Sequence, residues 1–361
     1  MNQKVKRIAV KIGSNVLARR DGTLDITRMS ALVDQVTELH RSGVEVVLIS
    51  SGAVASGRSE IKVGKKLDPV SARQLYSAVG QAKLINRYYE LFRDHGIRCG
   101  QVLTTKENFS SRTHYLNQKN CMEVMLANKV IPIVNENDTI SVTELMFTDN
   151  DELSGLIATM MGMDALIILS NVDGIYDGDP NDPQSVVIKE IAADHVDLNE
   201  YIQSDKSSFG RGGMLTKSRI ARKVAKEGIM VIIANGKTDN ILPQLLSKKS
   251  QIACTRFLPS EKPVSSVKKW IAHSEGFAKG EVHINKCAVD VLTGPKATSL
   301  LLVGVTEIVG DFEKGDIVRI INDKGVQIGV GCADYASKEA IGLLGQRDLK
   351  PLVHYDYLYL D

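Results

Sequence analysis

Residues 131–155, IPIVNENDTISVTELMFTDNDELSG, decide how this chain folds. The stretch begins with an apolar, β-branched run that is typical of a buried strand. Turn-forming polar residues occupy positions 135–138, and a second polar group at 149–151 precedes apolar residues at helical spacing. In a parallel α/β sheet, ligands bind where strand ends face helix starts. One such polar group indicates a turn or a helix cap, but two of them together predict a small-molecule site.

The same alternation of strands and helices extends on both sides of this stretch. Strands are expected at Ile8–Val10, Val44–Ser50, Ile97–Thr104, Ala165–Ser170 and Ile229–Ala234. Helices are expected at Thr27–Ser42, Val70–His95 and Arg112–Asn128. The small residues 51–57 are expected to form a loop whose amide groups can approach an anion closely. This order of elements predicts an α/β domain over residues 1–258 with a mostly parallel sheet.

The pattern changes after a connector, Leu258–Lys269, which contains two prolines and marks a domain boundary. Short strands separated by glycine-rich turns follow, at Glu281–Ile284, Ser299–Val303, Ile317–Ile321 and Gln327–Val330. They predict a second, small β-rich domain over residues 275–361.

The composition is ordinary for a protein of 361 residues, with 43% hydrophobic and 24% charged residues and a net charge of +2. This near-neutral balance gives no general nucleic-acid footprint. Five dispersed cysteines indicate reduced thiols, and no Cys/His spacing suggests a zinc site. No apolar run approaches the ~20 residues of a membrane span, and no signal peptide is recognisable, so a cytoplasmic protein is expected.

Two lysines occupy unusual positions. Lys11 ends a strand just before a Gly-Ser turn, where it is either an edge-strand gatekeeper or a cation aimed at a ligand. Lys217 lies in the first turn of a helix that a glycine-rich segment opens, where the helix dipole disfavours a cation. A bound anion would reverse that cost. The other basic residues of this helix are expected to form a solvated face.

These features favour phosphoryl transfer over other chemistries. The sequence contains neither the G-x-x-x-x-G-K-[ST] motif of P-loop proteins nor the G-x-G-x-x-G motif of dinucleotide-binding folds. Phosphoryl transfer requires cations around the moving group and accurate positioning. Lys11 and Lys217 would supply the charges, and a carboxylate such as Asp151 could hold both ammonium groups.

Five motifs, in this order, resemble those of the amino-acid kinase family: AVKIGSNVL (9–17), ISSGAVASGR (49–58), IVNEND (133–138), DNDELSG (149–155) and GRGGMLTK (210–217). The resemblance implies a three-layer α/β sandwich. It further implies ATP and Mg2+ as cofactors, and phosphorylation of the γ-carboxylate of L-glutamate to γ-glutamyl phosphate, the first step of proline biosynthesis. The alternatives within the family are kinases of acetylglutamate or aspartate.

The resemblance also implies roles for individual residues. Lys11 and Lys217 correspond to the lysines at the transferring phosphoryl group, and Asp151 to the carboxylate that orients them. Ser51, Asp138 and Asn150 correspond to amino-acid-binding positions. The ATP-binding set is Lys11, Ser170, Asn171, Arg211, Gly212, Gly213, Met214, Leu215, Thr216 and Lys217. Ser170-Asn171 stands where relatives often have Thr-Asp, and Arg211 and Leu215 replace smaller residues.

The C-terminal segment VTEIVGDFEKGDIVRI (305–320) resembles a PUA domain, a small β-barrel often found in RNA-modifying enzymes, although Cys287 falls where that pattern often has glycine. An RNA-binding role is therefore an alternative function, which the near-neutral charge and the 5% aromatic content disfavour. The family resemblance further implies feedback inhibition by proline, and a homo-oligomer is expected.

Overall fold

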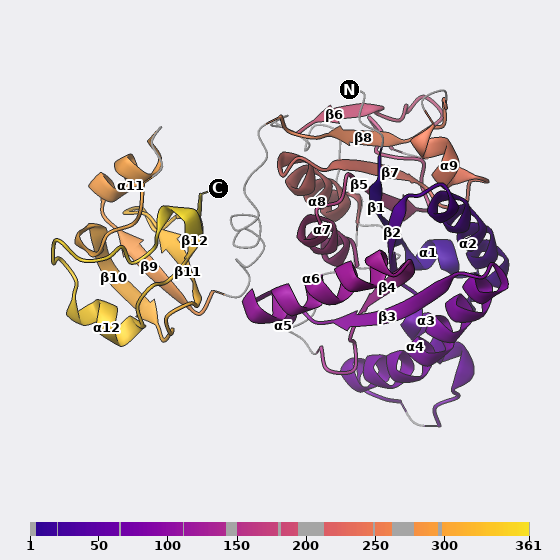
Figure 1. Cartoon of the computed structure of the whole chain (residues 1–361), viewed down its shortest axis with the longest axis horizontal. Coiled ribbons are helices and arrows are strands. Elements are labelled where there is room, and N and C mark those ends of the chain that lie inside the picture. The colour runs from indigo at the N-terminus through magenta and orange to yellow at the C-terminus, as the bar shows by residue number, and fades with distance from the viewer. Residues whose placement is uncertain are drawn as a thin grey trace. The chain divides into compact units, whose positions relative to one another are not determined.

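The computed structural model describes residues 5–19, 21–64, 66–110, 112–141, 150–179, 182–193, 213–247, 250–261, 278–294 and 298–360 (Figure 1). The chain divides into two compact units, residues 1–106 with 117–263 and residues 107–116 with 264–361. Most of the connector predicted at 258–269 lies outside the described residues, so the domain bounds 1–258 and 275–361 stay a prediction.

An eight-stranded sheet forms the first unit, in the order β3-β4-β2-β1-β5-β7-β8-β6. All of its neighbouring strands pair in parallel except β7 and β8, which confirms the mostly parallel sheet. The strands are β1 (Arg7–Ile12), β2 (Glu45–Ser50), β3 (Arg98–Thr104), β4 (Val130–Glu136), β5 (Ala165–Ser170), β6 (Glu190–Ala192), β7 (Met230–Asn235) and β8 (Thr255–Leu258). The sequence indicated neither β6 nor β8, which are short.

The helices before and between these strands are α1 (Ser14–Leu17), α2 (Ile26–Arg41), α3 (Ala53–Glu60), α4 (Pro69–Asp94), α5 (Glu107–Ser110), α6 (Arg112–Ala127), α7 (Asn150–Met161), α8 (Met214–Lys226) and α9 (Ile241–Leu246). The three long predicted helices begin and end within one residue of α2, α4 and α6. Capping explains the bounds of α4: the Asp68 side chain accepts from the amides of Val70 and Ser71, and Gly96 takes a φ of 70° after the end.

Alternation along β1 directs Lys11 to the site. Ile8, Val10 and Ile12 belong to the core cluster that also holds Leu32 and Val36 of α2. Side chains of successive strand residues point to opposite faces, so Lys11 projects from the face away from α2. The lysine is only 5% exposed, and a buried ammonium of this kind requires a counter-charge.

Helices α3 and α4 touch through their backbones. A Cβ on Gly80 would lie 1.8 Å from the carbonyl oxygen of Ala53, and one on Gly57 would lie 1.8 Å from that of Tyr76. The loop expected over residues 51–57 is therefore wrong beyond its first two residues. Gly57 serves helix packing rather than anion binding, because Ala53 already begins α3.

The second unit contains a five-stranded sheet in the order β10-β9-β11-β12-β13. Its elements are β9 (Gly280–Ile284), α11 (Lys286–Leu292), the 3-10 helix η3 (Leu302–Gly304), β10 (Val305–Gly310), β11 (Ile317–Ile321), β12 (Gln327–Cys332), α12 (Ser337–Gly342), the 3-10 helix η4 (Tyr355–Tyr357) and β13 (Leu358–Leu360). This sheet confirms the small β-rich unit, and β11 has the predicted bounds.

The strand expected at Ser299–Val303 is wrong. Leu300 forms only an isolated bridge with Val353, and the next residues turn into η3, where the Gly304 amide donates to the Leu301 carbonyl. Leu300 and Leu302 are buried while Leu301 and Val303 are exposed. That alternation imitates a strand although the chain packs as a bend, and the strand begins only at Val305.

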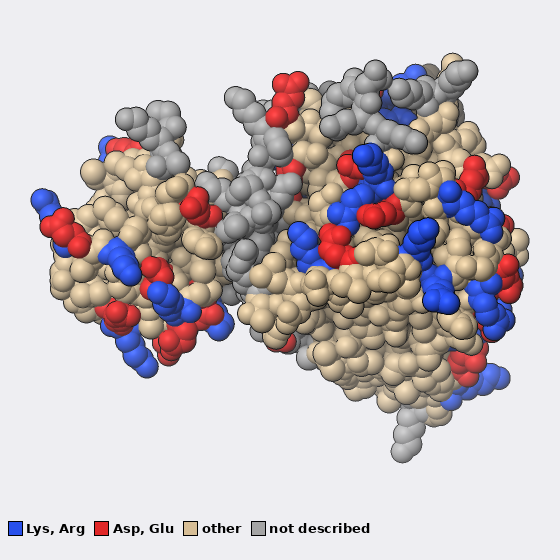
Figure 2. Space-filling model, in the orientation of Figure 1, with Lys and Arg blue, Asp and Glu red and all other residues tan. Residues whose placement is uncertain are grey.

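Among the described residues, no helix combines the length and the apolar character that crossing a bilayer requires. On the face drawn in Figure 2, acidic and basic side chains lie interspersed over both units. All five cysteines are free thiols.

Candidate active site

The site is centred on Asp151, which two lysines contact. Lys11 Nζ lies 2.5 Å from Asp151 Oδ1, and Lys217 Nζ lies 2.9 Å from Asp151 Oδ2. The three side chains are 7%, 11% and 1% exposed for Lys11, Lys217 and Asp151. Lys11 comes from the end of β1, Asp151 from the first turn of α7 and Lys217 from the first turn of α8. The structure thus brings together the three residues for which the sequence suggested a joint role.

Electrostatics keep this cluster charged. Burial by itself raises the pKa of the Asp151 carboxyl, but the ammonium groups of Lys11 and Lys217 outweigh burial and hold that pKa below its ordinary value. Asp151 is therefore ionised at neutral pH. One carboxylate between two ammonium groups gives these three side chains a net charge of +1, which suits an anionic ligand.

Two glycines allow the three elements to meet. A Cβ on Gly155 of α7 would lie 3.0 Å from a methyl of Ile220 and 3.1 Å from one of Val224, so α7 and α8 pack tightly there. Gly13 follows β1 and donates its amide to the Leu169 carbonyl at 3.1 Å. A Cβ on Gly13 would lie 3.1 Å from the Leu169 carbonyl oxygen, so glycine suits this close contact between the end of β1 and β5.

A network of amides adjoins this cluster. The Asn150 side chain donates to Ser51 Oγ at 2.9 Å and to Asn135 Oδ1 at 3.0 Å. Asn135 in turn donates to Gln81 Oε1 at 2.7 Å. Ser51 follows β2, where the preceding Ser50 shares a buried hydrogen bond of 2.8 Å with Tyr88. The ends of β2 and β4 and the start of α7 are therefore tied together, as the sequence predicted for two of these three segments.

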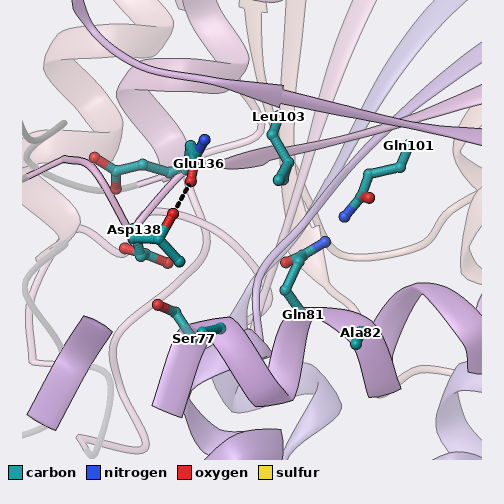
Figure 3. Close-up of a pocket in the computed structure, with 10 residues that line it drawn as sticks. Ser77, Gln81, Ala82, Gln101, Leu103, Glu136 and Asp138 are labelled. Carbon is teal, nitrogen blue, oxygen red and sulfur yellow. Dashed lines mark hydrogen bonds between the residues drawn. The ribbon is translucent and has the colours of Figure 1, made fainter. Parts of the chain in front are cut away.

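Asp138 lies beside Glu136 and Arg73 rather than beside the lysines. Arg73 Nε donates to Asp138 Oδ1 at 2.7 Å, its Nη2 donates to the same oxygen, and Nη2 also donates to Glu136 Oε2 at 3.0 Å. Glu136 and Asp138 are 4% and 7% exposed. They border a cavity of about 300 Å³ between α4 and the ends of β3 and β4 (Figure 3).

Sequence reasoning missed Arg73 and Gln81. Both belong to α4, where Arg73, Ser77 and Gln81 follow one another at intervals of four residues. Such spacing places polar groups on one helix face. Figure 3 shows Ser77 and Gln81 directed from α4 into the cavity, opposite Glu136 and Asp138. The row of Arg73, Ser77 and Gln81 was the signal in the sequence that could have indicated this part of the site. It was missed because the other residues of this long helix suggested ordinary packing.

Apart from the two lysines, the predicted nucleotide-binding residues that the structure describes fall at the end of β5 and at the start of α8. Ser170 ends β5, and its carbonyl accepts from the Gly236 amide at 2.8 Å. Nearby, Asn235 donates to Asp173 Oδ1 at 3.0 Å. The α8 part of the set begins at the N-cap and comprises Gly213, Met214, Leu215 and Thr216. Asn171 follows Ser170 directly, whereas Arg211 and Gly212 lie outside the described residues.

Comparison with known proteins adds two findings about family. Residues 6–235 match the model of the amino acid kinase family, and residues 280–351 match that of the PUA domain. A protein of Bacteroides thetaiotaomicron named glutamate 5-kinase is 71% identical over the full length of both chains. The glutamate 5-kinase of Chlorobaculum tepidum is 49% identical over 98% of this chain and 97% of its own, and that of Chromohalobacter salexigens is 36% identical over 98% and 93%.

Proposed function

Because this chain belongs to the amino acid kinase family, we propose that it transfers the γ-phosphoryl group of ATP to the γ-carboxylate of L-glutamate. The product would be γ-glutamyl phosphate, the first intermediate of proline biosynthesis. The observation that carries the proposal is the buried Lys11–Asp151–Lys217 cluster, together with the near-complete coverage by relatives named glutamate 5-kinase.

The chemistry needs little from the protein beyond charge and position. A carboxylate oxygen of glutamate forms a bond to the γ-phosphorus while the bond from that phosphorus to the β,γ-bridging oxygen breaks, which releases ADP. Negative charge on the transferring group requires cations, and Lys11 and Lys217 provide them in a setting from which water is largely excluded. The accepting carboxylate is already ionised at neutral pH, so the reaction requires no general base.

Asp151 acts through the two lysines in this proposal. Its two oxygens each hold one ammonium, at 2.5 and 2.9 Å, and so fix the separation of the two cations before the substrates arrive. Cations that are fixed in advance cost no reorganisation during the reaction.

The amino-acid end of the site is assigned to Asp138, Ser51 and Asn150. The substrate ammonium requires a carboxylate, and Asp138 is a nearly buried one at a strand end. Ser51 Oγ already accepts from Asn150, so its own hydrogen remains available to donate to a substrate carboxylate. ATP is assigned to Ser170, Asn171 and the residues from Arg211 to Thr216, together with Lys11 and Lys217.

Mg2+ is proposed to enter with the nucleotide. Among the described residues, no group of three or more histidine, cysteine or acidic side chains could enclose a metal ion. Mg2+ often binds through substrate phosphates and few protein ligands. The metal would neutralise phosphate charge when bound.

One assay tests the function. ADP release is measured with L-glutamate, L-aspartate and N-acetyl-L-glutamate as acceptors, each with and without a Mg2+ chelator. Turnover with glutamate alone, abolished by the chelator, is the expected result. Faster turnover with aspartate or N-acetylglutamate would assign the chain to another kinase of the family.

Replacement of Asp138 by alanine should raise the glutamate KM by about tenfold or more and leave the ATP KM nearly unchanged. Without Asp138, Arg73 and Glu136 form a neutral pair, and the substrate ammonium no longer meets the Asp138 carboxylate. Asp239→Ala is the matched control, because that side chain is 93% exposed. A parallel rise in both KM values would mean that Asp138 shapes the site without binding the amino acid.

We extend the proposal to proline as a feedback inhibitor that competes at or beside the glutamate site. Proline carries an ammonium and a carboxylate on one carbon, as glutamate does, so Asp138 and Asn150 offer it the same partners. Added proline should raise the apparent glutamate KM, and Asp138→Ala should blunt that rise. Purely non-competitive inhibition in initial-rate measurements would place proline elsewhere. A homo-oligomeric state stays a prediction.

A further inference from the structure

Arg73 is the cation that the structure places on the acidic pair of residues Glu136 and Asp138. Glu136 ends β4, Asp138 follows two residues later, and both carboxylates are at least nine-tenths buried. Arg73 contacts both from the second turn of α4, at 3.0 Å to Glu136 Oε2 and 2.7 Å to Asp138 Oδ1. Its own side chain is 24% exposed.

The contact of Arg73 with Glu136 and Asp138 sets the net charge of this part of the site. Two buried carboxylates so close together repel each other, and the guanidinium of Arg73 offsets that repulsion. With the guanidinium in place, the three groups carry a net charge of −1. Glutamate brings one ammonium, which this charge attracts, but also two carboxylates, which it repels. A site with the full charge of −2 would hold the ammonium and reject the rest of the molecule.

We propose that Arg73 is a positioning residue that determines amino-acid specificity: it half-neutralises Glu136 and Asp138, so that the site binds the ammonium and still admits the α-carboxylate. The inference rests on the proposed function, because it takes Asp138 as the partner of the ammonium. Arg73 acts through the two carboxylates and needs no contact with the transferring phosphoryl group.

Neighbouring contacts of α4 hold Arg73 in a fixed position. The Asp68 side chain caps α4 one turn earlier, and the neighbouring Gln74 donates to the Thr139 carbonyl at 2.8 Å. Consecutive residues of α4 therefore hold the chain from Glu136 to Thr139. A planar guanidinium can donate to two carboxylates at once, which the single ammonium of a lysine does less well.

The test compares four full-length proteins: the natural chain, Arg73→Met, Arg73→Lys and the control Arg87→Met. Arg87 lies on the same helix and pairs with Glu90 at the surface. Arg73→Met should raise the glutamate KM by about tenfold or more, with the ATP KM and kcat within about threefold of the natural values. Arg73→Lys should recover part of the loss, and Arg87→Met should behave as the natural protein does.

A second readout separates charge from shape. The α-amide of L-glutamate keeps the ammonium and the γ-carboxylate but lacks the α-carboxylate charge. Arg73→Met should reduce the preference for glutamate over this amide, measured as the ratio of kcat/KM values, by about tenfold. The double variant Arg73→Met/Glu136→Gln restores the net charge of −1 and should regain part of the glutamate affinity.

Each outcome decides the inference. An unchanged glutamate KM in Arg73→Met, an unchanged preference over the amide, or a double variant weaker than the single one would overturn it. These results leave the proposed function standing as long as the natural protein phosphorylates glutamate. If Arg73→Met does not fold, Arg73→Lys and Glu136→Gln carry the comparison, since Glu136→Gln alone removes the net charge and should also raise the glutamate KM. Absence of glutamate turnover by the natural chain would overturn the function and this inference together.

Discussion

Lys217→Ala should lower kcat by about two orders of magnitude or more while the protein remains folded, and Lys11→Ala should do the same. The reason is the charge of the cluster. Removal of either lysine leaves Asp151 paired with the other, so no buried charge is stranded and folding is preserved. The net charge of the three side chains falls from +1 to 0, however, which weakens the attraction for the charge that develops on the transferring phosphoryl group.

Lys226→Ala is the matched control for these variants. Lys226 ends the same helix and is exposed, so its loss should change kcat by less than about twofold. The kcat of each variant is measured from initial rates at saturating ATP and glutamate, and circular dichroism confirms that the protein is folded. Near-normal turnover by a folded Lys217→Ala protein would remove the lysine from the mechanism.

Asp151→Asn should cost about 3–5 kcal/mol of unfolding free energy at neutral pH and abolish most activity. The substitution keeps the shape but removes the negative charge that both buried ammonium groups contact. Urea unfolding measures the cost, and Asp34→Asn serves as the control, because Asp34 is an exposed partner of His95. A difference in stability below about 1 kcal/mol would show that the pair of lysines tolerates an uncharged neighbour.

The pH dependence of this stability has a definite sign. The pKa of Asp151 is lower in the folded state than in the unfolded state, where it is about 4. The contribution of Asp151 to the free energy of unfolding is therefore fully present above the unfolded-state pKa, and it is lost as the pH falls through the folded-state pKa. The stability difference between the natural protein and Asp151→Asn should therefore be constant around neutrality and shrink only in acid. A difference that already changes between pH 6 and 8 would implicate another group.

The sequence was informative wherever a functional residue stood at the end of an element. Lys11 and Lys217 each broke a local rule, as a lysine at a strand end and a cation in a first helical turn, whereas Asp151 stood in the second of two polar groups. Such conflicts are expected at functional sites. The structure joins these three residues. Their catalytic roles, like those of Ser51, Asp138 and Asn150, stay predictions.

Site residues in the middle of a helix could not be predicted in this way. Arg73 lies 63 and 65 positions from Glu136 and Asp138, within a 26-residue helix where arginine is an ordinary surface residue. The meeting of α4 with the end of β4 gives it these two partners, and no local pattern encodes that meeting. The Ser299–Val303 error has the related cause that alternating burial arises from a packed bend as readily as from a strand.

The contact of α3 with α4 has a consequence for how this sequence can change over generations. At Gly57 and Gly80 even a methyl group would overlap a backbone carbonyl, so the crossing point of the two helices admits no gradual substitution. This contact fixes the spacing between the Ser51 turn, which α3 continues, and Arg73 on α4. A new acceptor specificity would therefore have to arise by exchange of side chains and not by movement of these two helices.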